Sequence, residues 1–166
     1  MSARTGHWQA VVIVASTRAA AGVYEDRTGP VITAWLRERG WNVVDPIVVP
    51  DGRAVADALE TAVAARPALI ITTGGTGISP TDTTPEATGP LLQREIPGFM
   101  EELRRRGAAV TPTAILTRGH AGIAGSSFVV NLPGSTGGVR DGLDVLDGIL
   151  DHVLDQLGGG HAGHGR

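Results

Sequence analysis

Cysteine and lysine are both absent from the 166 residues of this chain. Without cysteine the chain has no disulfide, thiolate metal site, redox CxxC motif or cysteine nucleophile. Because all 14 basic residues are arginines, a Schiff-base lysine and the lysine of a P-loop are excluded as well. Any phosphate bound by this chain must therefore be held by other donors.

Aromatic residues and net charge are also scarce. Aromatics supply 4% of the chain, so the core must be built from Val, Ile, Leu and Ala. A net charge of −3 gives no electrostatic footprint for duplex nucleic acid, and we expect no nucleic-acid partner. No apolar run approaches ~18 residues and the N-terminus lacks a signal-peptide pattern, so we expect no membrane contact and a cytoplasmic location.

The first half of the chain alternates buried strands with amphipathic helices. Apolar runs rich in β-branched residues are typical of strands that are covered on both faces. Three runs have this character: 9–15, 41–49 and 68–73. Apolar residues at helical spacing between them predict one helix that begins near Thr28 and another that contains Val55 and Leu59. This βαβαβ order predicts an α/β fold with a largely parallel sheet.

The second half continues with two strands and more helices. We expect a helix over 97–107, strands over 113–117 and 127–132 joined by a glycine-rich turn, and one long amphipathic helix from Val139 to Leu157. The absence of repeats or composition shifts predicts a single domain over 1–157. The remaining residues, 158–166, form a Gly/His stretch that we interpret as a flexible tail.

The sharpest motif is Thr72-Thr73-Gly74-Gly75-Thr76-Gly77, which follows the third predicted strand. Glycines allow the backbone to approach an anion closely, consecutive N–H groups can bind it, and threonine hydroxyls add donors. The spacing matches neither GxGxxG nor the Walker A motif. The segment therefore indicates an anion or phosphate site, and its structural alternative is a tight strand-to-helix connection.

Asp51 and Asp82 form a second constellation, because each lies in a loop beyond a predicted strand. Ligands of open α/β sheets bind beyond the carboxyl ends of the strands. One or two carboxylates with substrate phosphates and water are a common Mg²⁺ site. The alternative is that each aspartate accepts hydrogen bonds in its own turn. Ser135 precedes the last helix, where its hydroxyl can cap the helix or contact an anion.

These motifs, in this order, resemble the Mog/MoaB family of molybdenum cofactor biosynthesis proteins. The resemblance extends over about 11–157 and includes the two motifs described above. The further matching segments are Gly22-Val23-Tyr24-Glu25-Asp26, Val49-Pro50-Asp51, Asp82-Thr83-Thr84-Pro85-Glu86-Ala87-Thr88, Ile96-Pro97-Gly98-Phe99, Pro112-Thr113-Ala114-Ile115-Leu116 and Asn131-Leu132-Pro133-Gly134-Ser135.

The resemblance implies a three-layer α/β/α sandwich with a mostly parallel central sheet, usually assembled as a homotrimer. It implies transfer of AMP from ATP to the terminal phosphate of molybdopterin, with Mg²⁺ and with release of pyrophosphate. A MoeA-type enzyme that inserts molybdenum is the implied recipient of the product. Two alternatives remain: a non-catalytic molybdopterin carrier or scaffold, and a binder of another phosphosugar or nucleotide.

The resemblance also assigns roles to individual residues. Asp51 and Asp82 match the acidic positions expected to hold Mg²⁺ and to take part in catalysis. The positions that match ligand-binding loops are Ser16, Thr73, Gly74, Gly75, Thr76, Gly77, Pro133, Gly134 and Ser135.

Overall fold

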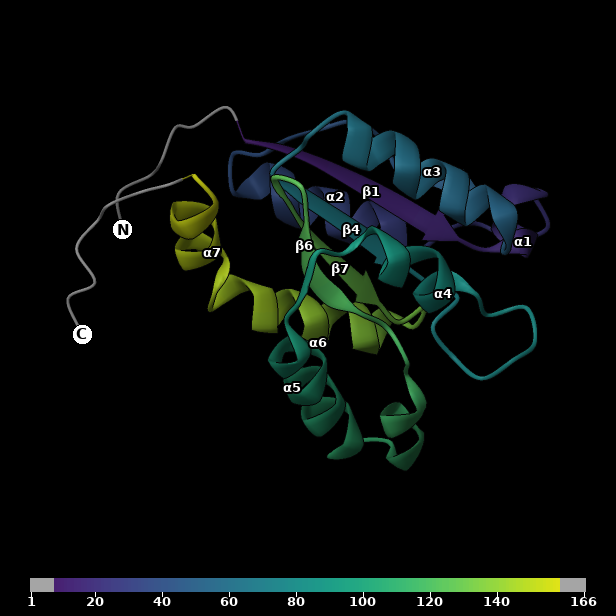
Figure 1. Ribbon diagram of the computed structural model, residues 1–166. Coiled ribbons are helices and arrows are strands. Elements are labelled where there is room, and N and C mark those ends of the chain that lie inside the picture. Colours follow the sequence, from purple (N-terminus) through teal and green to yellow (C-terminus); the bar gives the residue numbers. More distant parts are fainter. Residues whose placement is uncertain (1–7, 159–166) are drawn as a thin grey trace.

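The computed structural model describes residues 8–158 (Figure 1). The strands of this part of the chain are β1 (Gln9–Ala15), β2 (Asn42–Val43), β3 (Ile47–Val49), β4 (Leu69–Thr73), β5 (Arg94–Glu95), β6 (Ala121–Ala124) and β7 (Ser127–Leu132). The α-helices are α1 (Thr17–Ala20), α2 (Thr28–Glu38), α3 (Arg53–Ala64), α4 (Thr84–Thr88), α5 (Pro97–Ala108), α6 (Thr136–Asp147) and α7 (Leu150–Leu157). The described residues also form two 3-10 helices, η1 (Gly89–Leu91) and η2 (Pro112–Leu116).

All seven strands join one sheet in the order β2-β1-β4-β7-β6-β5, and β3 also pairs with β1. Strands β2, β3 and β4 each pair with β1 in parallel, and β7 pairs with β4 in parallel. The pairs β6–β7 and β5–β6 are antiparallel. The predicted mostly parallel sheet is therefore confirmed, with an antiparallel edge that the sequence did not reveal.

Helices cover both faces of this sheet, which confirms the α/β/α sandwich. Successive residues of a strand point to opposite faces, so Val12 and Ile71 join one core with α2, α5, α6 and α7. Ile13 and Ile70 join a smaller core with α3 on the other face. Figure 1 shows the sheet between these layers, with α3 on one side and α6 on the other.

The parallel strands bring four loops to one edge of the sheet. Strand β1 ends at Ala15, β3 at Val49, β4 at Thr73 and β7 at Leu132. Because parallel strands point the same way, the segments that follow them meet at this edge. In Figure 1 the arrow of β1 ends beside α1, and α4 lies at the same end of the sheet.

The strand predicted over 41–49 is divided into β2 and β3. Both pair with β1, with Gln9 opposite Asn42 and Ile13 opposite Ile47. Pro46 lies between them and has no backbone N–H, so it cannot donate to the ladder. The proline ring instead lies beside Gly29 of α2, where an added Cβ would be 2.8 Å from the ring.

The prediction of a strand over 113–117 is wrong. Residues 113–116 belong to η2, which has Pro112 at its start, Thr117 as its C-cap and Ile115 61% exposed. The strand before β7 is instead β6, within the segment predicted to be a turn. Gly122 permits this strand, because a Cβ there would lie within clashing distance of the Arg94 carbonyl of β5.

The last helix is broken, in contrast to the continuous helix predicted from its apolar stripe. Helix α6 ends at Asp147 and α7 begins at Leu150. At the break, the Gly148 and Ile149 N–H groups donate to the carbonyls of Val145 and Leu146, a tighter i→i−3 pattern.

Between residues 8 and 158 no helix is both long enough and apolar enough to cross a membrane. Gly158 ends α7, and the remaining residues of the predicted Gly/His tail, 159–166, lie outside the described residues.

Candidate functional site

The loop after β4 turns sharply through two glycines. Gly74 has a φ of 91° and Gly75 a φ of 67°, in the left-handed region that favours glycine. Neither position has room for a side chain. A Cβ at Gly74 would meet the Ala15 carbonyl, and one at Gly75 would meet the Thr84 hydroxyl. The two glycines thus let β4 pass against both β1 and the start of α4.

Backbone hydrogen bonds hold this loop from both sides. The Gly74 N–H donates to the Leu132 carbonyl (3.1 Å), and the Thr84 N–H donates to the Gly75 carbonyl (3.1 Å). The Thr84 hydroxyl donates to the Gly74 carbonyl (3.0 Å). By contrast, the N–H groups of Gly75, Thr76 and Gly77 make no hydrogen bond within residues 8–158. Three consecutive free donors are a suitable site for an anion.

The threonine hydroxyls of the motif have other partners. The Thr73 hydroxyl donates to the Pro133 carbonyl (2.7 Å). Thr73 and Thr76 are both almost fully buried. The Thr76 hydroxyl accepts a hydrogen bond from the Thr117 hydroxyl (2.9 Å). The hydroxyl of Thr73, which we expected to donate to an anion, therefore joins the β4 loop to the β7 loop. Backbone N–H groups remain as the donors of this motif.

Asp51 connects the β3 loop to the β1 loop. Its Oδ2 accepts from the Thr17 hydroxyl (3.0 Å) and the Thr17 N–H (3.3 Å), and its own N–H donates to that hydroxyl (3.1 Å). Its Oδ1 faces the glycine turn, because a Cβ at Gly75 would lie 3.1 Å from it. One carboxylate oxygen therefore orients the side chain and leaves the other for a ligand.

Asp82 lies at the opposite end of the glycine loop. Its Oδ2 accepts from the Ser79 N–H (3.0 Å), so the side chain closes a local turn. That oxygen also lies near Gly77, where an added Cβ would be 2.8 Å away. The turn role that the sequence left open is thus observed, and Oδ1 has no hydrogen-bond partner within the described chain.

A cavity of about 830 Å³ opens between the loops that follow β1, β3 and β4. Asp51, Asp82 and Ser135 line it, together with two arginines, Arg18 and Arg27. Neither guanidinium forms a hydrogen bond or ion pair with any other described residue. The sequence alone gave no reason to distinguish these arginines from the exposed residues of an ordinary loop. Only the fold places the segment after β1, which carries both arginines, beside the cavity.

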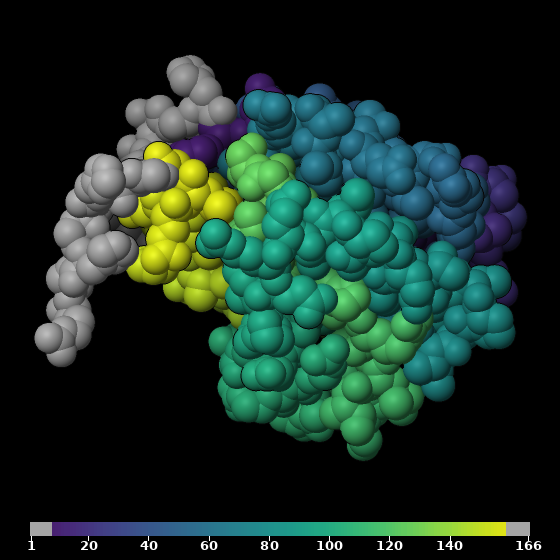
Figure 2. All heavy atoms as spheres, viewed as in Figure 1, coloured from purple at the N-terminus to yellow at the C-terminus, as the bar shows by residue number. Residues whose placement is uncertain are grey.

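A second cavity of about 760 Å³ lies on the other side of the glycine loop. Its walls include Leu103, Val110 and Leu116, and Asp141 of α6 adds a carboxylate. Helix α5 and η2 supply much of this wall, and Figure 2 shows their atoms as a lobe that projects from the body of the molecule.

The two cavities share the residues between them. Gly75, Asp82, Gly134 and Ser135 line both. Every residue that the sequence assigned to catalysis or ligand binding lines at least one cavity: Ser16, Asp51, Thr73, Gly74, Gly75, Thr76, Gly77, Asp82, Pro133, Gly134 and Ser135. The fold therefore brings all of these positions to one edge of the sheet.

Both predicted ligand-binding serines cap helices. The Ser135 hydroxyl accepts from the Gly138 N–H at the start of α6 (3.1 Å), as its position predicted. The Ser16 hydroxyl accepts from the Ala19 N–H at the start of α1 (3.2 Å) and donates to the Tyr24 hydroxyl (3.4 Å). Each hydroxyl thereby orients a loop that borders the first cavity.

The donor set of this site is compatible with Mg²⁺. No group of three or more His, Asp or Glu side chains in the described part of the chain is placed to hold a metal by itself. Mg²⁺ commonly takes one or two carboxylates and completes its shell with water and substrate phosphates. Asp51 and Asp82 each keep one carboxylate oxygen that accepts no hydrogen bond from the described residues, so they fit that pattern.

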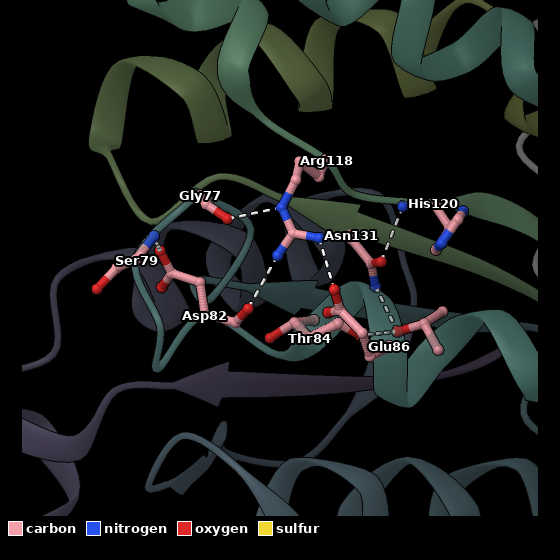
Figure 3. Close-up of polar contacts among 9 residues, drawn as sticks. Gly77, Ser79, Asp82, Thr84, Glu86, Arg118, His120 and Asn131 are labelled. Carbon is pink, nitrogen blue, oxygen red and sulfur yellow. Dashed lines mark hydrogen bonds and ion pairs between the residues drawn. The ribbon is translucent and has the colours of Figure 1, made fainter.

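Arg118 is a further residue that the sequence did not reveal, and it lies beside the site without lining either cavity. It follows η2 and reaches the loop after β4, where its guanidinium donates to the Gly77 and Asp82 carbonyls (2.8 and 2.9 Å). It also forms an ion pair with Glu86 (2.6 Å), which lowers the pKa of that carboxyl below its ordinary value. Figure 3 shows Arg118 between these three acceptors. A single arginine in a coil segment carries no sequence signal of such contacts.

Comparisons with known proteins agree with this architecture. Residues 11–152 match the family described as "Probable molybdopterin binding domain". The chain is 35% identical to a Helicobacter pylori protein named molybdopterin adenylyltransferase, over 90% of this chain and 88% of that protein. It is 38% identical to a Synechococcus elongatus protein named molybdenum cofactor biosynthesis bifunctional protein, over 98% of this chain and 56% of that one. The chain thus spans about half the length of that relative.

Solved structures give the same result. The molybdopterin biosynthesis Mog protein from Mycobacterium ulcerans superposes with a TM-score of 0.87 at 53% identity, over 92% of this chain and 99% of that one. The chain therefore belongs to the Mog/MoaB family of molybdenum cofactor biosynthesis proteins.

Proposed function

We propose that this protein is a molybdopterin adenylyltransferase, which transfers AMP from ATP to the terminal phosphate of molybdopterin. The observation that carries the proposal is the pair of cavities that meet at one glycine loop, with Asp82 lining both. A transfer between two bound substrates needs two adjoining sites and a shared place for the reacting phosphates. The names of relatives such as the Helicobacter pylori protein support the same activity.

The second cavity suits the pterin. Its apolar wall around Leu103 and Leu116 can cover a flat heterocycle, and the carboxylate of Asp141 can accept hydrogen bonds from ring N–H groups. The free N–H groups of the glycine loop lie at the border with the first cavity and would bind the terminal phosphate.

The first cavity suits the nucleotide. Arg18 and Arg27 carry the unpaired positive charges of this wall, and guanidinium groups bind phosphate oxygens well. They would take the place of the lysine that this chain lacks. Asp51 and Asp82 would hold Mg²⁺, which supplies neutralisation of phosphate charge when bound.

The reaction is a substitution at phosphorus. An oxygen of the pterin phosphate forms a bond to the α-phosphorus of ATP, and the bond from that phosphorus to the bridging oxygen of the β-phosphate breaks. Pyrophosphate leaves with the bonding electron pair. Because both reactants are anions, the main task of the protein is to place and neutralise them. The glycine-loop N–H groups and the two arginines perform that task here.

A direct assay tests this proposal. Purified protein, molybdopterin, Mg²⁺ and labelled ATP should yield adenylylated pterin and pyrophosphate. Asp82→Asn should lower the rate about 100-fold or more, because a metal-holding charge is lost. An amide oxygen can still accept from the Ser79 N–H, so the turn should persist. The matched control is Asp144→Asn, an exposed aspartate of α6 that lines neither cavity.

The outcomes separate the two functions that the sequence left open. Pterin binding without AMP transfer in the wild-type protein would identify a carrier or scaffold instead of an enzyme. Transfer at the wild-type rate by Asp82→Asn would remove Asp82 from the catalytic machinery.

We also propose that the protein acts in the cytoplasm as a homotrimer and delivers its product to a MoeA-type enzyme. Ile115 of η2 is 61% exposed and lines neither cavity, so a second copy could cover this side of the lobe while the second cavity stays open. Light scattering at micromolar concentration should give three chain masses, and a monomer mass would contradict the trimer.

A further inference from the structure

Arg118 contacts one short segment of the chain at several points. Its N–H donates to the Thr76 carbonyl (2.8 Å), and its guanidinium reaches the Gly77 carbonyl, the Asp82 carbonyl and the Glu86 carboxylate. We call residues 76–86 the Asp82 segment. Figure 3 shows Arg118 with acceptors from the beginning, middle and end of this segment.

The middle of the Asp82 segment has little else to hold it. Residues 78–81 are exposed, and Ile78 is 68% exposed. The Ser79–Asp82 hydrogen bonds are local, since they join residues three apart. Within the described chain, the hydrogen bonds that reach residues 77–83 from distant parts of the sequence all come from Arg118.

The chemistry of arginine explains how one side chain does this. The planar guanidinium carries five N–H donors in a fixed fork, so it can serve several acceptors at once with defined angles. Lysine offers a single charged nitrogen on a flexible stem and cannot span the Gly77 and Asp82 carbonyls in the same way. A change from arginine to lysine at this position would therefore keep the charge and lose the geometry.

We propose that Arg118 is a positioning residue for the AMP transfer, which fixes the backbone of Asp82 so that its carboxylate points into the shared border of the two cavities. This inference rests on the function proposed above. Arg118 lines neither cavity, so it acts on the reaction through Asp82 and does not contact the substrates.

The alternative is a purely structural role, in which Arg118 stabilises the fold without affecting the chemistry. The matched control for that role is Arg104. Its guanidinium donates to the carbonyl of Thr117, the residue before Arg118 (2.9 Å). Arg104 tethers the same stretch of chain by a guanidinium–carbonyl hydrogen bond, but it does not reach the Asp82 segment. Arg104→Gln therefore tests the loss of such a bond alone.

The experiment compares Arg118→Gln, Arg118→Lys and Arg104→Gln by hydrogen exchange and by steady-state kinetics. In the protein without substrates, Arg118→Gln should speed exchange of the Ser79 and Asp82 amides at least about tenfold, because these are the hydrogen-bonded amides of residues 77–83 and the segment opens more readily. Arg104→Gln should leave these amides unchanged. For AMP transfer, Arg118→Gln should lower kcat at least about tenfold with a KM for molybdopterin within about twofold. Arg118→Lys should restore little of this loss.

A double-mutant cycle identifies the route of the effect. Because Arg118 acts through Asp82, adding Arg118→Gln to Asp82→Asn should lower kcat by less than about twofold further. Fully multiplicative losses would overturn the positioning role.

The other outcomes are equally distinct. Unchanged amide exchange in Arg118→Gln would overturn the inference whatever the activity. Faster exchange with an unchanged kcat would leave Arg118 a structural residue and also overturn it. A wild-type protein that transfers no AMP would contradict the proposed function and with it the catalytic part of the inference, while the exchange data would still report whether Arg118 holds the segment.

Discussion

At the scale of single residues, the glycine turn combines two demands at one position. Gly75 needs a positive φ, and the space that a Cβ would take is occupied by the Thr84 hydroxyl and bordered by Asp51. The same residue has a free N–H at the border of both cavities. Its lack of a side chain therefore serves the turn and the ligand site together.

We expect Gly75→Ala to lower both stability and ligand affinity. The positive φ costs an L-residue about 1–2 kcal/mol, and the displaced Thr84 hydroxyl also loses its hydrogen bond to Gly74. The total loss of unfolding free energy should be about 2 kcal/mol or more. A displaced N–H should weaken molybdopterin binding about tenfold or more. Urea denaturation and calorimetric titration measure the two effects.

Gly125 provides the matched control for the strain alone. It has a φ of 59° and no atom within 4 Å of an added Cβ, and it lies in the β6–β7 turn away from both cavities. Gly125→Ala should cost about 1–2 kcal/mol and leave binding unchanged. Equal losses of stability in the two variants would mean that the Thr84 contact adds nothing at Gly75.

At the scale of secondary-structure elements, Asn131 connects strands and a helix behind the site. Its side-chain amide donates to the hydroxyls of Thr72 on β4 (2.9 Å) and Thr88 on α4 (3.0 Å). Its Oδ1 accepts from the His120 N–H (2.9 Å) at the start of β6. Figure 3 shows Asn131 near Arg118, with the hydrogen bond from His120 as a dashed line. The fully buried amide thus fixes the relative positions of four elements.

Removal of this amide should be strongly destabilising. Asn131→Ala leaves the His120 N–H and the buried Thr72 hydroxyl without a partner among the described residues, whereas the Thr88 hydroxyl still donates to the Thr84 carbonyl. Each unsatisfied group costs about 1–3 kcal/mol. We expect a loss of about 3 kcal/mol in urea denaturation. Asn131→Asp keeps the shape but cannot donate to both hydroxyls, so it should also be destabilised. Asn42→Ala, at an exposed position of β2, should stay within about 0.5 kcal/mol of wild type, and a similarly small change at Asn131 would contradict this account.

At the scale of the whole molecule, stability should depend on pH through the Arg118–Glu86 ion pair. The hydrogen bond from Arg118 lowers the pKa of Glu86 in the folded state. A lowered folded pKa means that the pair stabilises the fold above the ordinary glutamate pKa of about 4.3. That contribution is lost as the pH falls through the lowered pKa. Because Glu86 is mostly exposed, the effect should be small.

The test is the difference in Tm between wild type and Glu86→Gln. We expect wild type to melt higher at pH 6–7, and the difference to shrink below about pH 4.3 and vanish in stronger acid. Added salt should reduce the difference at neutral pH. A difference that grows as the pH falls would reverse the sign of this argument.

Local patterns in the sequence were sufficient for the α/β class, the buried strands over 9–15 and 68–73, and the glycine loop. Apolar runs and glycine-rich turns report burial and backbone geometry directly, because they depend on near neighbours in the chain. The same local patterns failed at Pro46, in η2 and at Gly148. At those points, pairing with a distant strand or packing under a helix decides the conformation.

The sequence by itself determined which residues could carry the chemistry: the absence of lysine, the free backbone of the glycine loop, and Asp51 and Asp82 after predicted strands. The tertiary structure alone decided how they meet. Parallel pairing of β1, β4 and β7 placed loops separated by about sixty residues at one edge of the sheet. It also brought Arg118 onto the Asp82 segment, because hydrogen bonds between distant parts of a chain exist only after the sheet has set their distance.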